Sequence, residues 1–273
     1  MTFSVLAHDP ETGDMGIAVS SCILAVGRAV PCARPGVGVV AVQARSRRGL
    51  RTSLLGGLAE GTAPAELVRR AAHAAEDADR QIAVLDATGA VAADTGQGSF
   101  PVSGHLLGEG FSVQGNMLAS AEVLPAMSHA FTAARGALPD RLLAALSAGQ
   151  SAGGDLRGRQ SAALLVVGGS PATDEDDGVR VDLRVDDSGD PVAQLRMLRN
   201  LQRAYDERDY EMLALFAPEG ARDLYAALAA SRRGDRAAAR SALEEMRARP
   251  GWSAWLASMA GDARVAAVSR LLD

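Results

Sequence analysis

Residues 2–20 read TFSVLAHDPETGDMGIAVS, and this stretch decides the fold class of the amino-terminal part of the chain. Its first six residues favour β-structure and run into a turn-forming cluster at residues 9–14. A second strand-like run follows at once at residues 15–20, and residues 23–30 and 37–43 continue the pattern. Four closely spaced strands predict a largely antiparallel sheet.

Farther along the chain, helical and strand patterns alternate. Leucines at helical spacing run from Gly49 to Gly61, and a second helix is predicted to begin at Pro64. Two more helices are predicted at residues 121–134 and 138–148. The remaining predicted strands are residues 82–86, 90–93, 111–114, 161–167 and 179–185. This order predicts an α+β protein with four αββα layers, in which two sheets face each other between outer helix pairs.

A polar break at residues 186–191 separates this pattern from a tail that reads as helices only. We therefore predict one domain over residues 1–189 and a small all-α domain over residues 190–273. The helices of the tail are predicted at residues 192–207, 209–216, 221–231, 235–248 and 263–272.

Composition and charge exclude several classes of function. The formal net charge is −5, which provides no general attraction to nucleic acid or to a membrane of anionic lipid. All 28 basic residues are arginines, so lysine Schiff bases and a lysine general base are excluded. The opening residues show neither the basic region nor the long apolar region of a signal peptide, and no stretch approaches the roughly 20 apolar residues of a membrane span. We expect a cytoplasmic protein.

The residue types that hold metals and cofactors lack the necessary spacing. Cys22 and Cys32 form no CxxC motif, and we expect both to be buried thiols. His8 and His105 lie far apart, without a metal-binding motif. Residues 36–41 (GVGVVA) lack the third glycine and the following helix of a dinucleotide fingerprint, and no G-x-S-x-G elbow is present. The sequence thus predicts no metal and no cofactor, and disfavours Rossmann enzymes and Ser-His-Asp hydrolases.

The position of Thr2 carries a chemical possibility of its own. Threonine directly follows the initiator Met1, and a methionine aminopeptidase removes methionine before small side chains. The exposed α-amine would have a pKa of about 8 and would act as general base for the adjacent hydroxyl. Many unrelated chains carry threonine at position two, so Thr2 on its own does not identify a nucleophile.

Several motifs in order resemble one known family. The opening TFSVLAHDPETGDMGIAVSS and LAVGRAVPCARPGVGVVAVQA are followed by TG at residues 95–96, QGNMLA at 114–119, AGQSAGGDLRGRQSAALLVV at 148–167 and DLRVDD at 182–187. Over residues 2–190 the chain resembles the domain-of-unknown-function family 1028, which is assigned to the N-terminal-nucleophile (Ntn) hydrolase superfamily. Members often carry a helical tail described as peptidoglycan-binding. The resemblance implies an αββα sandwich and an amide-hydrolysing site near Thr2.

Further residues are candidates for this site. Asn116 ends a predicted strand before a helix, where its amide and a backbone N–H could stabilise an oxyanion, although asparagine is equally favoured as a turn and helix cap. Gln43 ends the fourth predicted strand and is a candidate substrate-binding residue, although strand-end amides more often bind backbone groups.

The glycine-rich segment at residues 153–161 places charged and amide side chains before a buried strand. Arg157 is suited to binding a substrate carboxylate through two hydrogen bonds, and Asp155 to orienting the amine of Thr2 or a substrate ammonium. Gln160 completes the predicted substrate-binding set. An internal pair between Asp155 and Arg157 that fixes the loop explains the same residues equally well.

Two segments depart from the family pattern. Relatives carry an Asn-Pro-x-Tyr-Gly type of sequence where this chain reads RSRRG at residues 45–49, and an aromatic position before Gly104 reads FPVS at 100–103. If these segments line the pocket, substrate preference or activity has changed. The three arginines there could meet an anionic substrate or cap a solvated helix start.

The sequence therefore supports an Ntn amidohydrolase that acts through Thr2 on a small amide or peptide-like substrate. Two alternatives remain open. One is a non-catalytic binding module that binds a ligand or glycan through the crevice or the helical tail, and the other is a purely structural oligomer. Exposed alanine-rich faces and edge strands also make a homodimer compatible with the sequence.

The intact mass of the purified protein tests the first step of the proposed chemistry. We expect a mass that lacks one methionine, because the α-amine of Thr2 can act as a base only after Met1 is removed. Intact-protein mass spectrometry makes the measurement. Full retention of Met1 would favour the binding module.

Overall fold

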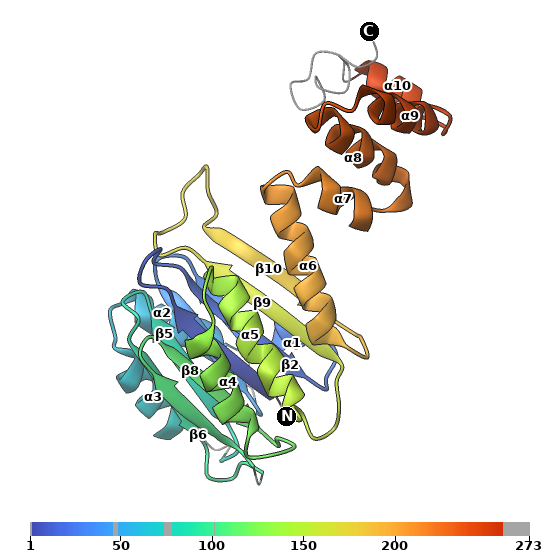
Figure 1. Cartoon of the computed structure of the whole chain (residues 1–273). Helices are drawn as coiled ribbons and strands as arrows, with labels where there is room; N and C mark the ends of the chain where they lie inside the picture. The colour runs from blue at the N-terminus through green and yellow to red at the C-terminus, as the bar shows by residue number, and fades with distance from the viewer. Residues whose placement is uncertain (1, 46–48, 74–77, 101, 259–273) are drawn as a thin grey trace. The chain divides into compact units, whose positions relative to one another are not determined.

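The computed structural model describes residues 2–45, 49–73, 78–100 and 102–258 (Figure 1). The chain divides into two compact units, residues 1–196 and 197–273, and the boundary falls within helix α6 (Pro191–Asp206). The first unit is a mixed α+β structure with two antiparallel sheets, which confirms the predicted fold class at this level.

The larger sheet has six strands in the order β10-β9-β2-β1-β8-β7, and every neighbouring pair is antiparallel. Its strands are β1 (Thr2–His8), β2 (Met15–Ser21), β7 (Gly104–Gly108), β8 (Phe111–Asn116), β9 (Ser161–Val167) and β10 (Val179–Val185). Strand β1 lies between β2 and β8, so the first residues of the chain are paired on both sides. This pairing places Thr2 opposite Asn116.

The smaller sheet has the order β3-β4-β5-β6 and is also antiparallel throughout. Its strands are β3 (Pro31–Arg34), β4 (Gly38–Gln43), β5 (Gln81–Asp86) and β6 (Val91–Thr95). The strands predicted near the amino terminus as one sheet are thus divided between two sheets: residues 2–7 and 15–20 lie in the larger sheet and residues 37–43 in the smaller one, because the chain leaves the larger sheet after Ser21 and enters the smaller one at Pro31.

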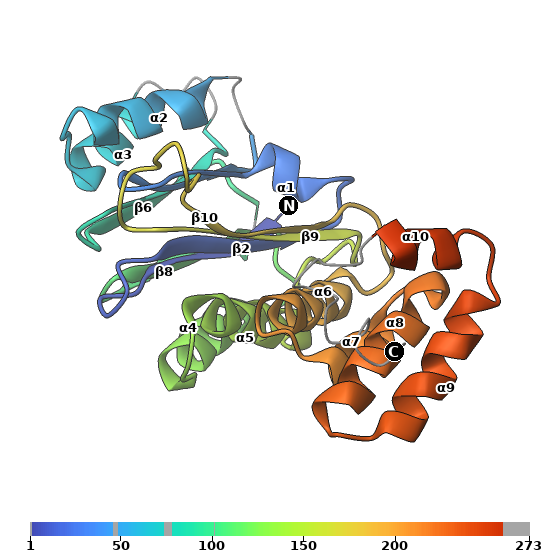
Figure 2. The same ribbon diagram turned by 90° about the horizontal axis from the view of Figure 1, so that it is seen from above.

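Two helix pairs cover the outer faces of the sheets (Figure 2). Helices α2 (Leu50–Ala59) and α3 (Pro64–His73) pack on β4, β5 and β6, with Leu54, Leu58 and Leu67 in a shared core. Helices α4 (Val123–Ala133) and α5 (Leu138–Ser151) pack on the larger sheet. The layers therefore follow the order helix pair, sheet, sheet, helix pair.

The side chains between the two sheets change from apolar to polar along the strands. Leu6, Ile17 and Leu85 belong to a buried apolar cluster at one end of this layer. Two residues before Leu6, Ser4 donates instead to Gln43 of the facing sheet. Because alternate residues of a strand face the same side, Thr2 lies on this inter-sheet face as well. The Thr2 end of the layer is thus polar and fully enclosed.

The predicted strand at residues 23–30 is wrong. Ala25 adopts a left-handed φ of 55°, and α1 (Val26–Ala29) follows as a single helical turn. The buried hydroxyl of Ser161 accepts from Val26 N at 3.0 Å and donates to the carbonyl of Ile23 at 2.6 Å. Short apolar runs do not separate strand from helix, and here a distant serine stabilises the turn that connects the two sheets.

Other differences between prediction and structure are smaller. Strands β3 and β7 were not predicted, and β8 continues two residues beyond the predicted end to include Asn116. The strand predicted at residues 179–185 is confirmed as β10, which lies at one edge of the larger sheet. Both Cys22 and Cys32 are half-buried rather than fully buried.

The second unit is helical over its described residues. It contains the end of α6 and α7 (Tyr210–Phe216), α8 (Glu219–Arg232), α9 (Arg236–Arg247) and α10 (Trp252–Ser258). Leu228, Leu243 and Met246 lie in its core, with Trp252 and Trp255 packed against it. The helix predicted at residues 263–272 lies outside the described residues. Within the described part of the chain, every helix is too short or too polar to cross a membrane.

Ser161→Ala tests the stabilisation of the turn at α1. We expect the free energy of unfolding to fall by about 1–3 kcal/mol, because the Val26 N–H and the Ile23 carbonyl lose a buried partner. Thermal unfolding of residues 1–196 is best followed by circular dichroism, because all three tyrosines and both tryptophans lie at residues 205–255.

Ser53→Ala is the matched control. Ser53 lies exposed on α2, so this change should alter the free energy of unfolding by less than about 0.5 kcal/mol. Equal effects of the two substitutions would refute the role given to Ser161.

Candidate functional site

Thr2 is held inside the protein at the end of the central strand β1. The residue is 3% exposed, and its Oγ1 lies 3.1 Å from Oγ of Ser21. The carbonyl of Thr2 accepts a hydrogen bond of 3.4 Å from Nε2 of Gln43, on the facing sheet. Contacts from both sheets therefore restrict the position of the hydroxyl, which a frayed terminus would not do.

Gln43 and Asn116 meet at a third amide, that of Gln81. Nε2 of Gln43 lies 2.6 Å from Oε1 of Gln81, and Nδ2 of Asn116 donates to the same oxygen at 3.0 Å. Gln43 and Asn116 are each about 2% exposed and Gln81 is fully buried. The structure thus joins Gln43 and Asn116 through Gln81, a residue that was not predicted, and Thr2 contacts Gln43 and pairs with Asn116.

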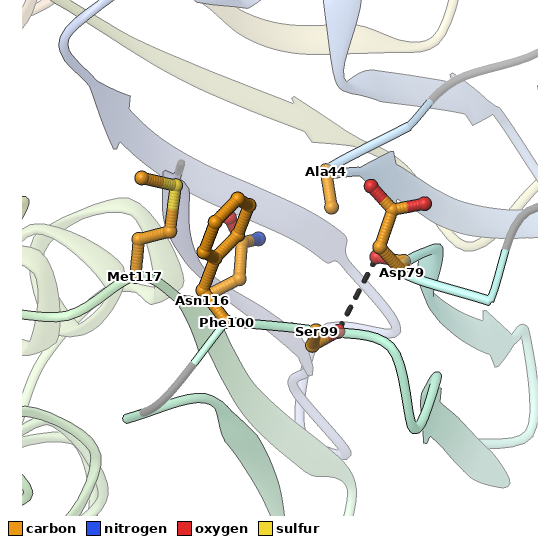
Figure 3. Close-up of a pocket in the computed structure, with 6 residues that line it drawn as sticks. All are labelled: Ala44, Asp79, Ser99, Phe100, Asn116 and Met117. Atoms are coloured by element: carbon orange, nitrogen blue, oxygen red, sulfur yellow. Dashed lines mark hydrogen bonds between the residues drawn. The ribbon is translucent and has the colours of Figure 1, made fainter.

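A small cavity opens beside Asn116 (Figure 3). Its volume is about 70 Å³, enough for a few water molecules or one short chemical group. The described residues that line it are Ala44, Asp79, Ser99, Phe100, Asn116 and Met117. Two lining residues, Ala44 and Met117, directly follow Gln43 and Asn116 in the chain, so the amide cluster and the cavity share a wall.

Backbone strain gathers around this cavity. Ala44 has a φ of 64° and Met117 a φ of 50°, in the left-handed region that residues other than glycine rarely adopt. Val102 has a φ of 59°, and its carbonyl accepts from the backbone N–H of Leu118, next to Met117. Each such residue costs about 1–3 kcal/mol, and strain of this kind collects at functional sites.

Asp79 of the cavity lining forms an ion pair with Arg45, the first residue of the arginine-rich segment 45–49. Nε of Arg45 lies 3.3 Å from a carboxylate oxygen of Asp79, and Arg45 is 64% exposed. Arg47 and Arg48, which the sequence analysis grouped with Arg45, lie outside the described residues. The carboxylate of the lining residue Asp79 is therefore paired with the guanidinium of Arg45.

Asp155 is engaged by the loop that it starts and by the end of strand β2. Its carboxylate, 1% exposed, accepts from the backbone N–H of Arg157 and from the Arg157 guanidinium at 3.1 Å. It also accepts from the backbone N–H of Cys22 at 2.9 Å, directly after Ser21. These contacts match the alternative in which the Asp155 and Arg157 pair fixes a loop, here a loop that supports the partner of Thr2.

Gln160 reaches a different part of the surface. Its side-chain amide donates to Asp187 at 3.1 Å, while its backbone N–H donates to the carbonyl of Ser21. Among the described residues, the cavity lining includes neither Arg157 nor Gln160. The described residues also contain no group of three or more histidine, cysteine or acidic side chains placed to hold a metal ion.

Comparison with known proteins gives the family. A family model described as "Family of unknown function (DUF1028)" matches residues 2–195. The chain belongs to the DUF1028 family. The crystal structure of protein SPO2555 from Silicibacter pomeroyi, described with the same family, shares 34% identity and a TM-score of 0.66, and covers 74% of this chain and 88% of that one.

A second solved structure is more distant. The Anbu (Gly-1) mutant from Hyphomicrobium sp. strain MC1 shares 12% identity, with 76% of this chain and 97% of that chain covered. Its TM-score of 0.36 is too low to bear on the fold. No curated protein matches the chain.

Sequence reasoning overlooked Gln81 and the buried polar layer beside this DUF1028 site, although the strand pattern contained a signal for them. Ser4, Gln81 and Gln114 are fully buried, and Thr2 with Ser4 and Gln114 with Asn116 share strand faces at a spacing of two. Polar residues repeating every second position in otherwise apolar strands indicate a polar face. The hydrogen-bond partner of each buried polar side chain depends on how the two sheets face each other.

Asp155→Ala tests the loop pair. We expect the free energy of unfolding to fall by about 1–3 kcal/mol, because the partly buried N–H of Cys22 loses its bond to Asp155 and the Arg157 guanidinium loses one of its contacts. The control is Arg159→Ala, which removes an exposed ion pair with Asp190 of 3.5 Å and should cost less than about 1 kcal/mol. Circular dichroism during urea unfolding measures both, and an equally small effect of Asp155→Ala would contradict the assignment.

Proposed function

We propose that this DUF1028 protein is an N-terminal-nucleophile amidohydrolase with an Ntn-like αββα sandwich, and that Thr2 attacks a small amide once Met1 has been removed. The observation that carries the proposal is that the buried Thr2 pairs in the sheet with Asn116, which lines the cavity. A family match that begins at residue 2 is consistent with it.

The reaction begins with proton transfer from the Thr2 hydroxyl to its own α-amine as Oγ1 bonds to the substrate carbonyl carbon. The carbonyl oxygen becomes an oxyanion, and a hydrogen of the Asn116 amide is the proposed donor to it. When the C–N bond breaks, the leaving nitrogen takes the proton from the Thr2 ammonium. An acyl ester on Oγ1 remains.

Water completes the cycle by attacking this ester. The α-amine takes a proton from the water, the C–O bond to Thr2 breaks, and the proton returns to Oγ1 while the acid leaves. Because the amine serves as the base in both halves, the mechanism needs neither metal nor cofactor. The contact from Gln43 to the Thr2 carbonyl supports the proposal, since it restrains the backbone next to the nucleophile.

The size of the cavity supports a small substrate. A space of about 70 Å³ accepts a short acyl or amine group but not a folded polypeptide. With this activity we propose a cytoplasmic protein, catalytic over residues 1–189 and with a helical domain over residues 190–273. It would act on a free small-molecule amide and would require neither nucleic acid nor membrane. A homodimer is compatible with this assignment.

A non-catalytic binding module is the second candidate, and one feature of the helical unit favours it. Trp252 and Trp255 form an edge-to-face pair with ring centroids 5.2 Å apart. Together with Pro250 and Gly251 they line a cavity of about 270 Å³. Aromatic walls of this kind suit a ligand with apolar faces. In this alternative Met1 is retained and Thr2 stays unreactive.

Acylation by para-nitrophenyl acetate tests the nucleophile. Attack by Oγ1 of Thr2 transfers the acetyl group and releases para-nitrophenolate, so we expect a burst of phenolate and one acetyl group on residue 2 by peptide mapping. The rate should rise with pH up to about 8, because only the neutral α-amine accepts the proton.

Variants at Thr2 supply the controls. Thr2→Ala should abolish labelling at residue 2 while the protein remains folded by circular dichroism, with only the loss of stability expected from removing the contact to Ser21, whereas Thr2→Ser should keep the labelling. A burst of the same size in Thr2→Ala would sink the proposed function.

A further inference from the structure

The amide of Gln81 can be placed in only one of its two orientations. Its Nε2 lies 2.9 Å from the carbonyl oxygens of both Gly104 and Gly115, and 2.8 Å from Oγ1 of Thr95. Backbone carbonyls only accept hydrogen bonds, so this end of the amide must be the NH₂ group. If nitrogen and oxygen were exchanged, the buried Gln81 oxygen would face the carbonyl oxygens of Gly104 and Gly115, and none of the three could donate a hydrogen bond.

This orientation fixes the amides of two neighbouring residues. The other end of Gln81 is an acceptor, and both Gln43 and Asn116 approach it, so each must turn its NH₂ group toward it. Asn116 uses one N–H in this bond. Its second N–H and its carbonyl oxygen make no hydrogen bond within the described residues, and Asn116 lines the cavity.

A second branch of the same network leads away from Asn116. Since Gln43 turns its NH₂ group to Gln81, its oxygen accepts from the hydroxyl of Ser4 at 2.9 Å. That hydroxyl in turn accepts from Gln114 at 2.6 Å, and the oxygen of Gln114 accepts from Ser112. Gln114 is therefore fully buried between the same sheets as Gln81 but does not bind Asn116.

We infer that Gln81 is a positioning residue of the proposed reaction, which orients the Asn116 amide so that one N–H stays directed to the oxyanion. The inference rests on the proposed function. Gln81 belongs to the smaller sheet and Asn116 to the larger one, so the donor is aligned by a bond between the sheets. Without that bond the amide can rotate, and a donor displaced by about 1 Å can cost up to a hundredfold in rate.

Gln81→Met and Gln114→Met form the test pair, because methionine has a similar length to glutamine and makes no strong hydrogen bond. We expect Gln81→Met to slow acylation of Thr2 by para-nitrophenyl acetate by about ten- to a hundredfold at saturating probe, with little change in the half-saturating concentration. Gln114→Met removes an equally buried amide that makes no bond to Asn116, so it should slow acylation much less than Gln81→Met does. Replacing any buried glutamine lowers stability. Thermal unfolding of both variants measures this loss, so that it can be separated from an effect on the acylation rate.

Gln81→Glu provides a rescue that a purely structural role would not produce. A protonated carboxyl group donates through its O–H and accepts through its carbonyl oxygen, as the amide does, whereas the carboxylate cannot donate to Gly104 or Gly115. Burial raises the pKa of such a carboxyl group. Relative to the wild-type rate at the same pH, its acylation rate should therefore exceed that of Gln81→Met at low pH and fall as pH rises through that pKa.

The outcomes separate the inference from the function on which it rests. Absence of acetylation at Thr2 in the wild-type protein overturns the proposed function and the inference together. Acetylation that is equally fast in Gln81→Met and Gln114→Met overturns the inference alone. If Gln81→Met does not fold, Gln81→Glu decides, and a pH profile parallel to that of the wild type counts against positioning.

Discussion

Hydrogen bonding between Gln81 and Asn116 connects the two sheets at the end of the layer that they enclose. A buried amide left without partners costs about 1–3 kcal/mol, so every polar group placed here requires another beside it. The result is a network of hydrogen-bonded amides and hydroxyls. The carbonyls of Gly104 and Gly115 fix which end of the Gln81 amide donates, and this sets the direction of the bonds that follow. In the rest of the layer, apolar side chains around Leu6 and Leu85 pack between the sheets and need no hydrogen-bond partners.

Polar enclosure, backbone strain and the cavity coincide at this same end. Ala44 and Met117 have left-handed backbones where the chain leaves Gln43 and Asn116, and both then line the cavity. A layer selected only for stability would continue the apolar packing, because paired polar groups contribute little more than they cost to bury. Costly features of this kind collect at functional sites, so their concentration beside Asn116 supports the proposed chemistry.

The sequence predicted the helices and strands better than the long-range contacts between them. Alternation and helical spacing identified most strands and helices of residues 2–185, since these patterns follow from local geometry. The segment at residues 23–30 was predicted wrongly because its turn depends on Ser161, more than 130 residues away. Gln81 was overlooked for a similar reason, because a glutamine at a strand start shows no function until Asn116 and Gln43 are seen to meet it.

By itself, the sequence determined the mixed α+β class, the absence of lysine chemistry, the position of Thr2 at the head of a strand and the family to which the chain belongs. These depend on composition and on short-range order. Only the tertiary structure decided that Asp155 binds Arg157 and Cys22, that Gln160 reaches Asp187, and that Thr2, Gln43 and Asn116 gather around Gln81. Hydrogen bonds are short and directional, so they depend on how two sheets face each other, which strand periodicity does not specify.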